Sequence, residues 1–153
     1  MDPQPSSDPL SFIFHEGKLL VRSTDLKLPD AEVAAGLSAG TGGMQPLGLF
    51  DGRYCQATWA NGESLAPQGY EWRGLRSLFG EWDEDLLGLA GRAAQISEWA
   101  RTHRFCGACG SAMEKVTGER CFKCGHCGMT AYPRISPAMM VLSRKGDAYL
   151  MAM

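Results

Sequence analysis

Four cysteines in the second half of the chain stand in two copies of one pentapeptide pattern. The copies are Cys106-Gly107-Ala108-Cys109-Gly110 and Cys124-Gly125-His126-Cys127-Gly128. Two C-x-x-C turns that face each other supply the four thiolates of a tetrahedral Zn²⁺ site. Glycine after the second cysteine of each turn permits the tight backbone that aims amides at the sulfurs. The spacing therefore predicts a zinc ribbon whose metal ligands are Cys106, Cys109, Cys124 and Cys127.

Protein would fill all four coordination positions of this zinc, so the site is closed and cannot activate water. Its expected role is structural, because metal binding folds a segment too small to have its own core. Cys121 complicates the second knuckle, since Cys121-Phe122-Lys123-Cys124-Gly125 is also a C-x-x-C-Gly turn. We choose Cys124 and Cys127 because this pair repeats the Cys-Gly-x-Cys-Gly pattern of the first knuckle.

The remaining thiols and imidazoles have plainer interpretations. Cys121 becomes a spare thiol, either packed on the ribbon or exposed, and Cys55 is interpreted as a buried structural thiol beside an apolar patch. His103 and His126 are the alternative ligands if an imidazole replaces a cysteine. The C-x-x-C spacing, without a signal peptide before it, favours metal binding over a disulfide framework.

Composition narrows the class of protein. The chain has 153 residues, of which 44% are hydrophobic and 21% charged, as expected for one or two small globular domains. Fifteen basic and 17 acidic residues give a net charge of −2, which disfavours non-specific binding of nucleic acid. Residues 1–9 are rich in Pro, Ser and Asp, which predicts a disordered tail and no secretion signal. No apolar run reaches the roughly 18 residues of a membrane helix, so we expect a soluble cytoplasmic protein.

The elements that must position the cysteines begin with a small sheet. Short apolar runs predict strands within residues 12–14, 18–21, 46–50 and 54–59. Asp51-Gly52 is a strong hairpin signal between the last two runs, and Glu16-Gly17 is a weaker one between the first two. Residues 36–43 are rich in Gly, Ser and Ala, which predicts a loop.

A long helix is expected to join this sheet to the ribbon. Apolar residues recur at helical spacing over residues 83–102, and Asp83, Glu84 and Asp85 would favour the helix dipole in the first turn. Gly88 and Gly91 lower the helix propensity, so we expect them to pack closely against the sheet.

Beyond the ribbon, the pattern predicts an apolar strand over residues 138–142, a turn over 144–147 and the start of another strand over 148–153. A last strand without a partner would leave an exposed apolar sheet edge, which natural proteins avoid. We therefore expect the chain to be the front part of a longer protein, or a truncated one.

Several segments around the cysteines share their order with one family. They are Leu89-Ala90-Gly91-Arg92-Ala93, then Arg101-Thr102-His103-Arg104-Phe105, the two knuckles, and Tyr132-Pro133-Arg134-Ile135-Ser136-Pro137 before an apolar strand. This arrangement resembles the NADH pyrophosphatase (NAD diphosphatase) family of Nudix hydrolases. The resemblance covers roughly residues 75–153, and residues 10–74 match only as the divergent amino-terminal domain expected there.

The sequence pattern and the resemblance together predict an α+β protein in four parts. These are a tail over residues 1–9, a Nudix-like mixed-sheet domain with a long helix over 10–102, the ribbon over 103–131, and the first strands of a truncated Nudix α/β/α domain over 132–153. Members of the family hydrolyse NADH or NAD to nicotinamide mononucleotide and AMP, and some remove the NAD cap from RNA. They commonly form homodimers.

Three substrate contacts of the family can be carried over by position. Arg76 resembles the arginine before the long helix, Glu119 the acidic residue of the ribbon loop, and Tyr132 the tyrosine beside the nicotinamide. The plain alternatives are a solvated charge at a helix end for Arg76, a surface turn residue for Glu119, and a core tyrosine for Tyr132.

The chain departs from the family in its chemistry. The family's Nudix box, Gly-x5-Glu-x7-Arg-Glu-x2-Glu-Glu-x-Gly, holds two or three Mg²⁺ or Mn²⁺ ions that polarise the pyrophosphate and position water. We find no such segment here, and the acidic run 81–85 is better explained as a helix start. We therefore predict no catalytic residue and no hydrolysis by this chain alone.

Two hypotheses from other functional classes stay open. One is a stand-alone zinc-ribbon module that binds nucleic acid, and the other is a non-catalytic dimerisation module. The first is supported by basic side chains around the ribbon, for which a solvated face is the alternative; they are Arg101, His103, Arg104, Lys115, Arg120, Lys123 and Arg134.

Overall fold

A computed structural model describes residues 8–38, 43–60, 65–134 and 141–149 of the chain. The predicted tail over residues 1–9 therefore lies largely outside the described residues. Among the described residues, no helix is both long enough and apolar enough to cross a membrane.

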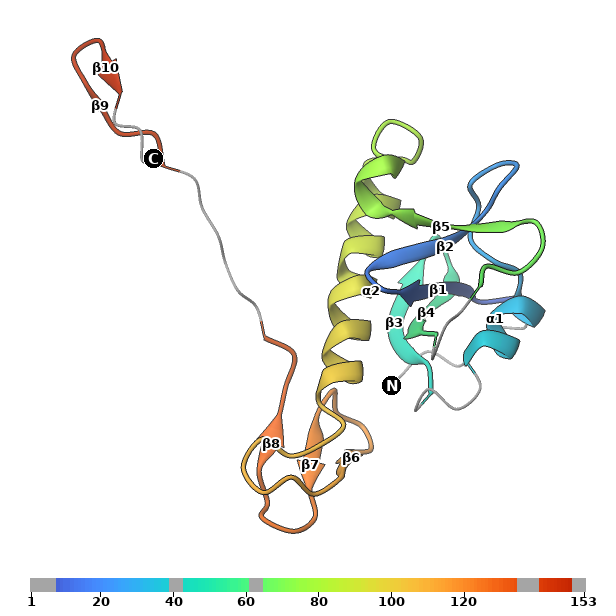
Figure 1. Cartoon of the computed structure of the whole chain (residues 1–153), viewed down its shortest axis with the longest axis vertical. Helices are drawn as coiled ribbons and strands as arrows, with labels where there is room; N and C mark the ends of the chain where they lie inside the picture. Colours follow the sequence, from blue (N-terminus) through green and yellow to red (C-terminus); the bar gives the residue numbers. More distant parts are fainter. Residues whose placement is uncertain (1–7, 39–42, 61–64, 135–140, 150–153) are drawn as a thin grey trace.

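A five-stranded mixed sheet forms the first half of the protein, as the apolar runs predicted (Figure 1). Its strand order is β3-β4-β1-β2-β5, in which β1 pairs with β4 in parallel and every other pair is antiparallel. The strands are β1 (Leu10–His15), β2 (Lys18–Arg22), β3 (Gln45–Phe50), β4 (Arg53–Trp59) and β5 (Tyr70–Gly74).

Both predicted hairpin turns are present. Glu16 and Gly17 have φ of 48° and 76°, and Asp51 and Gly52 have φ of 48° and 74°. Positive φ at both central residues is the type I′ geometry, whose twist matches that of the flanking strands. These turns set the registers of β1 with β2 and of β3 with β4.

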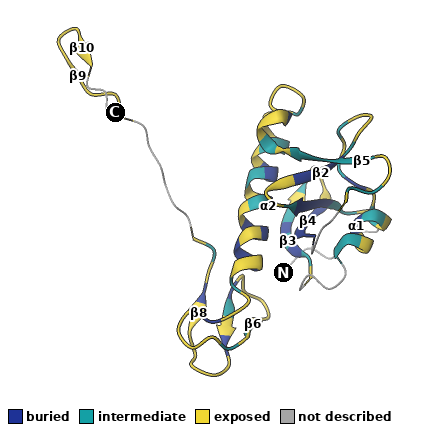
Figure 2. Ribbon diagram, viewed as in Figure 1, coloured by how far each residue is buried: buried dark blue, intermediate teal, exposed yellow. Residues whose placement is uncertain are grey.

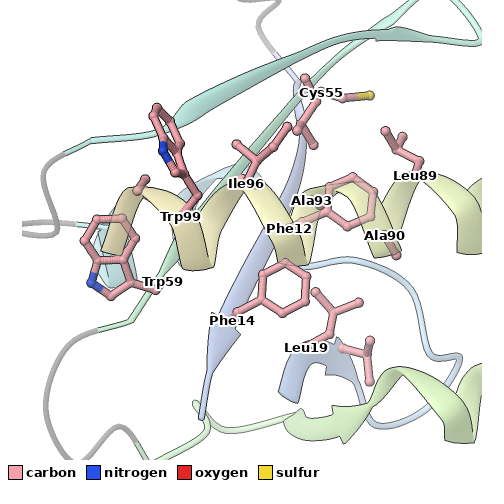
Figure 3. Packing of buried hydrophobic residues seen from close by; sticks show 14 of the residues in the cluster. Phe12, Phe14, Leu19, Cys55, Trp59, Leu89, Ala90, Ala93, Ile96 and Trp99 are labelled. Atoms are coloured by element: carbon pink, nitrogen blue, oxygen red, sulfur yellow. The ribbon is translucent and has the colours of Figure 1, made fainter. Parts of the chain in front are cut away.

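Two helices cover opposite faces of the sheet. Because side chains alternate along a strand, Phe12 and Phe14 of β1 pack with the long helix α2 (Glu84–Thr102), whereas Ile13 packs with the short helix α1 (Ala31–Ser38). The larger cluster on the α2 side is shown in Figure 3. Cys55 is fully buried there, as predicted, and burial raises the pKa of its thiol.

The long helix begins and ends close to the predicted residues. The Asp83 carboxylate accepts a hydrogen bond from the Leu86 amide at 2.8 Å and caps the first turn. His103 follows the last turn as the C-cap. The expectation for Gly88 and Gly91 was wrong: a Cβ atom at either position would meet nothing within 4 Å, so neither glycine is needed for close packing.

Three elements of the first domain were not predicted, namely α1, β5 and a 3₁₀ turn, and one prediction is corrected. Residues 36–38, expected to be loop, form the last part of α1; residues 39–42 lie outside the described residues. The edge strand β5 and a 3₁₀ turn, η1 (Leu75–Leu78), also escaped prediction. The sequence of β5 does alternate aromatic and charged residues, and Tyr70 and Trp72 both pack on the α1 side of the sheet, so a strand signal was present and was missed.

The second half of the chain is a small three-stranded antiparallel sheet followed by a hairpin. The sheet consists of β6 (Met113–Lys115), β7 (Phe122–Cys124) and β8 (Thr130–Ala131), and the hairpin of β9 (Arg144–Lys145) and β10 (Ala148–Tyr149).

The carboxy-terminal predictions are met only in part. Residues 138–140 of the predicted apolar strand lie outside the described residues, and Val141 and Leu142 are exposed and in no strand. The predicted turn is shorter than expected, because Arg144 and Lys145 belong to β9. The described residues of this hairpin are all exposed (Figure 2).

The ribbon is fixed to the first domain at two places. The ring of Phe122 on β7 lies 4.8 Å from that of Trp99 on α2, measured between centroids. The Arg120 guanidinium donates a hydrogen bond to the backbone oxygen of Pro46 on β3, the edge strand of the large sheet. Arg92 of α2 donates to the neighbouring oxygen of Leu47 at 2.6 Å.

Candidate functional site

The two cysteine knuckles share one backbone geometry. The amide of Cys106 donates to the oxygen of Ser111 at 2.7 Å, and the amide of Gly110 donates to the oxygen of Cys106 at 2.9 Å. The second knuckle repeats both bonds, from Cys124 to Met129 and from Gly128 to Cys124, at 2.8 and 3.0 Å. Gly110 and Gly128 have φ of 75° and 76°, a region that favours glycine, which explains why the glycines repeat with the cysteines.

These knuckles bring the four predicted sulfurs together. All four lie within 4.8 Å of one another; the distance is 3.5 Å between the sulfurs of Cys106 and Cys127, and 3.6 Å between those of Cys109 and Cys124. Zn–S bonds of about 2.3 Å in a tetrahedron give sulfur–sulfur edges of roughly 3.8 Å. The four cysteines are thus placed to hold a zinc ion.

The electrostatics of the cluster also suit a cation. The amides of Ala108 and Cys109 lower the pKa of Cys106, and the hydroxyl of Ser111 lowers the pKa of Cys109 to about 6. Although the Met129 amide acts in the opposite direction, the neighbouring sulfurs of Cys106 and Cys109 raise the pKa of Cys127 to about 12. Thiolates this close repel one another, and a divalent cation among them allows all four to ionise.

The competing ligands lie outside this cluster. Cys121 is buried, at 1% exposure, and its thiol is directed to the backbone oxygen of Phe122 at 3.3 Å. Nδ1 of His103 lies 2.8 Å from the backbone oxygen of Trp99, and His126 is exposed beside the second knuckle. Among the described residues, Cys106, Cys109, Cys124 and Cys127 form the only such group of potential ligands.

Two of the three predicted substrate contacts meet beside the ribbon. Glu119 lies in the turn between β6 and β7, and Tyr132 follows β8. The Tyr132 hydroxyl donates a hydrogen bond to Oε2 of Glu119 at 2.9 Å. This bond to a carboxylate favours the neutral phenol and raises the pKa of Tyr132 to about 12.

Glu119 and Tyr132 share a hollow of about 780 Å³ between the ribbon and the outer side of α2. The alternative of a core tyrosine does not hold, because Tyr132 is 53% exposed. Gly88 and Gly91 line the hollow. A Cβ atom on either glycine would meet no other atom within 4 Å, so the hollow is open at both positions. The other lining residues are Arg92, Gln95, Ile96, Trp99, Arg120, Pro133 and Arg134.

Arg134 is a lining residue that the substrate predictions omitted, although its position two residues after Tyr132 could have indicated it. Arg76 is the opposite case. It is exposed in η1, before the first turn of α2, whereas the ribbon follows the last turn. A 19-residue helix is about 28 Å long, so the structure does not bring Arg76 to Glu119 and Tyr132 (Figure 1).

Three of the seven basic residues around the ribbon are engaged by other groups of the protein. Arg101 is bound by both oxygens of Glu98, at 2.6 and 2.8 Å, and Arg120 is held by β3. His103 is engaged at the end of α2. Arg104 and Arg134 are exposed, and neither takes part in an ion pair within the described part of the chain.

The sequence matches two family models in the order of these structural parts. Residues 10–99 match the NADH pyrophosphatase-like rudimentary NUDIX domain, and residues 101–132 match the NADH pyrophosphatase zinc ribbon domain. The chain belongs to the NADH pyrophosphatase family. The α+β fold and the ribbon predicted from the sequence are therefore confirmed.

Curated relatives carry the name NAD-capped RNA hydrolase NudC. The protein of Pseudomonas putida (strain W619) is 46% identical over 106 residues, which are 69% of this chain and 38% of the relative. Those of Deinococcus radiodurans and Pseudomonas fluorescens (strain Pf0-1) are 41% and 38% identical, over 91% and 94% of this chain and 47% and 49% of their own lengths. The chain thus spans less than half the length of these relatives.

Proposed function

We propose that the whole protein to which this chain belongs hydrolyses the pyrophosphate of NADH or NAD, either as the free dinucleotide or as the cap of an RNA. Water attacks one phosphorus atom, and the bond from that phosphorus to the bridging oxygen breaks. The products are nicotinamide mononucleotide and AMP from the free dinucleotide, or nicotinamide mononucleotide and an RNA with a 5′-monophosphate from the capped RNA. Family membership and the names of the relatives support this activity.

One observation in the structure carries the proposal: Tyr132 and Glu119, joined at 2.9 Å, face a common hollow beside the ribbon. The exposed ring of Tyr132 offers a flat face on which nicotinamide can stack. Glu119 holds the hydroxyl of that ring and keeps a second carboxylate oxygen to accept from a ribose hydroxyl. Arg76 remains proposed as a third contact from the family pattern alone.

The metals have separate roles in this proposal. Zn²⁺ bound by Cys106, Cys109, Cys124 and Cys127 fixes the ribbon loop that carries Glu119 and the segment that carries Tyr132. Mg²⁺ or Mn²⁺ supplies the charge that polarises the pyrophosphate, held by a Nudix box in the remainder of the protein. We accordingly propose that the 153-residue chain is inactive alone, and that the whole protein is a cytoplasmic homodimer.

Product analysis tests this function. The whole protein and the 153-residue chain are each incubated with NADH and either Mg²⁺ or Mn²⁺, and the nucleotides are separated by chromatography. We expect equal amounts of reduced nicotinamide mononucleotide and AMP from the whole protein, and intact NADH from the chain. Intact NADH with both metals in the whole protein would refute the activity, whereas turnover by the chain would refute only its proposed inactivity.

A further inference from the structure

A second hollow, of about 420 Å³, opens on the ribbon and has no role in the function proposed above. It shares Tyr132, Pro133 and Arg134 with the larger hollow but extends over the first knuckle and β8. Its remaining lining residues are Thr102, His103, Phe105, Gly107, Met129, Thr130 and Ala131.

Two exposed aromatic rings line this ribbon hollow. Phe105 is 63% exposed and Tyr132 is 53% exposed, although both rings lie on a small domain with little core. A backbone bridge between Phe105 and Ala112 fixes the chain that presents the phenylalanine. Gly107 and Met129 complete the lining: a Cβ on this glycine would already stand 3.8 Å from the methionine methyl group. The hollow therefore combines exposed aromatic and apolar groups with polar side chains.

Two arginines supply positive charge at this hollow. The Arg104 guanidinium lies 5.8 Å from the centroid of the Phe105 ring, and Arg134 lines the hollow. Neither arginine is in an ion pair within the described residues, and no described lining residue is acidic. Exposed aromatic rings interleaved with unpaired arginines are the combination that binds single-stranded nucleic acid, through base stacking and phosphate contacts.

We propose that this hollow binds the single-stranded RNA that follows an NAD cap, with a base stacked on Phe105 and phosphates beside Arg104 and Arg134. The inference rests on the proposed function, in which the dinucleotide occupies the neighbouring hollow of Glu119 and Tyr132. Tyr132, Pro133 and Arg134 line both hollows, so the two hollows adjoin. Single strands are favoured because a base can stack on a side chain only after it leaves a helix.

This site is local, which agrees with a protein of net charge −2. Two arginines neutralise about two phosphates, so the logarithm of the association constant should fall with the logarithm of salt concentration with a slope of only about −1.4. A broad basic face would give a much steeper slope. Stacking on Phe105, which salt hardly affects, supplies the remaining affinity.

Binding of a fluorescein-labelled oligoadenylate to the 153-residue chain, followed by fluorescence anisotropy, tests the site. The Phe105→Ala protein lacks the ring on which one base stacks, so its affinity for the oligoadenylate should be roughly 5- to 150-fold lower than that of the wild type. Arg104→Gln and Arg134→Gln should each reduce the salt slope by about 0.7. Phe79→Ala is the matched control, because Phe79 is 70% exposed but lies between η1 and α2, away from the ribbon. The Phe79→Ala protein should bind the oligoadenylate with the affinity of the wild type.

Zinc content, measured for every variant, shows whether the ribbon is intact. If the Phe105→Ala protein loses zinc, the Phe105→Leu protein is measured in its place, since leucine keeps the apolar bulk and lacks the aromatic face. No RNA binding by the wild-type chain, or equal affinities of the Phe105 and Phe79 variants, would overturn the proposal.

Kinetics of the whole protein separate this inference from the proposed function. The Phe105→Ala protein should lose kcat/KM for NAD-capped RNA by the factor measured for binding, and should keep the wild-type kcat/KM for NADH. If the wild type hydrolyses neither substrate, the proposed function fails. If it hydrolyses both and Phe105→Ala leaves capped RNA unaffected, the RNA site alone fails.

Discussion

At the scale of single residues, the hydrogen bond between Tyr132 and Glu119 changes an acid strength that can be measured. With a carboxylate as acceptor, ionisation of the phenol would place two negative charges together, so the pKa of Tyr132 stands at about 12. In Glu119→Gln the acceptor is neutral, and we expect the pKa to fall towards the ordinary value of about 10.

The titration can be followed by NMR of ¹³C-labelled tyrosine, with Tyr132→Phe identifying the resonance. At about pH 9 and below, both proteins should show a mainly neutral phenol; at about pH 11 the phenol should be mainly ionised in the Glu119→Gln protein and mainly neutral in the wild type. A wild-type midpoint near 10 would show that the 2.9 Å bond does not persist in solution.

The choice of zinc ligands is also decided at single residues. Cys124→Ser removes one of the four clustered sulfurs, and we expect zinc to fall from about one per chain to near zero, because a structural site depends on its full ligand set. Cys121→Ser is the matched control, since this thiol is buried in the same ribbon but lies outside the cluster. Elemental analysis of the purified proteins gives the result. Zinc retained by Cys124→Ser, or lost from Cys121→Ser, would reverse the assignment of the second knuckle.

At the scale of elements, the contact of Phe122 on β7 with Trp99 on α2 joins the ribbon to the first domain. Truncating this half-buried ring should cost about 2 kcal/mol, less than for a fully buried phenylalanine. We expect Phe122→Ala to lower the free energy of unfolding by that amount in urea denaturation. Phe79→Ala, at a 70% exposed position, should change it by less than about 0.5 kcal/mol. Equal effects of the two substitutions would mean that the ribbon and α2 do not pack together.

The elements that sequence could predict are those that local chemistry determines. Asp51-Gly52 predicted its hairpin because positive φ at two successive residues favours those residue types. The Asp83 cap and helical spacing likewise predicted α2. Helix α1 buries only Ala34 fully, so no clear periodic pattern marked it. Strand β5 does alternate Tyr70 and Trp72 with charged residues, but this run is only four residues long and was missed. Their structure depends on the sheet that they complete.

The candidate functional site likewise has one part that the sequence predicts and one part that it does not. The ligand cysteines follow from a repeated pentapeptide, because each knuckle closes on itself. The meeting of Glu119 with Tyr132 depends on the antiparallel pairing of β7 with β8, and no local pattern specifies it. The sequence correctly predicted that Gly88 and Gly91 belong to the long helix, but the predicted packing against the sheet was wrong. A sequence pattern alone cannot distinguish a glycine that packs against a sheet from one that borders a hollow.

At the scale of the whole molecule, the ribbon is a fixed extension of the sheet domain. Arg120, the residue after Glu119, binds the edge strand β3, and Phe122, two residues further along, packs on α2. The zinc site therefore sets the position of the loop, and the loop sets the position of Tyr132. In the function proposed above, the closed metal site would contribute to binding of the dinucleotide without touching it.

The measurement that tests this account most directly is the hydrolysis of NADH by the whole protein with Tyr132→Ala. If the ring of Tyr132 stacks on the nicotinamide, its loss should lower kcat/KM by about tenfold, and Tyr132→Phe, which keeps the ring, should retain most of the activity. Zinc content must equal that of the wild type in both variants. Unchanged KM and kcat in Tyr132→Ala would contradict the account, because the hollow beside the ribbon would then have no part in binding the dinucleotide.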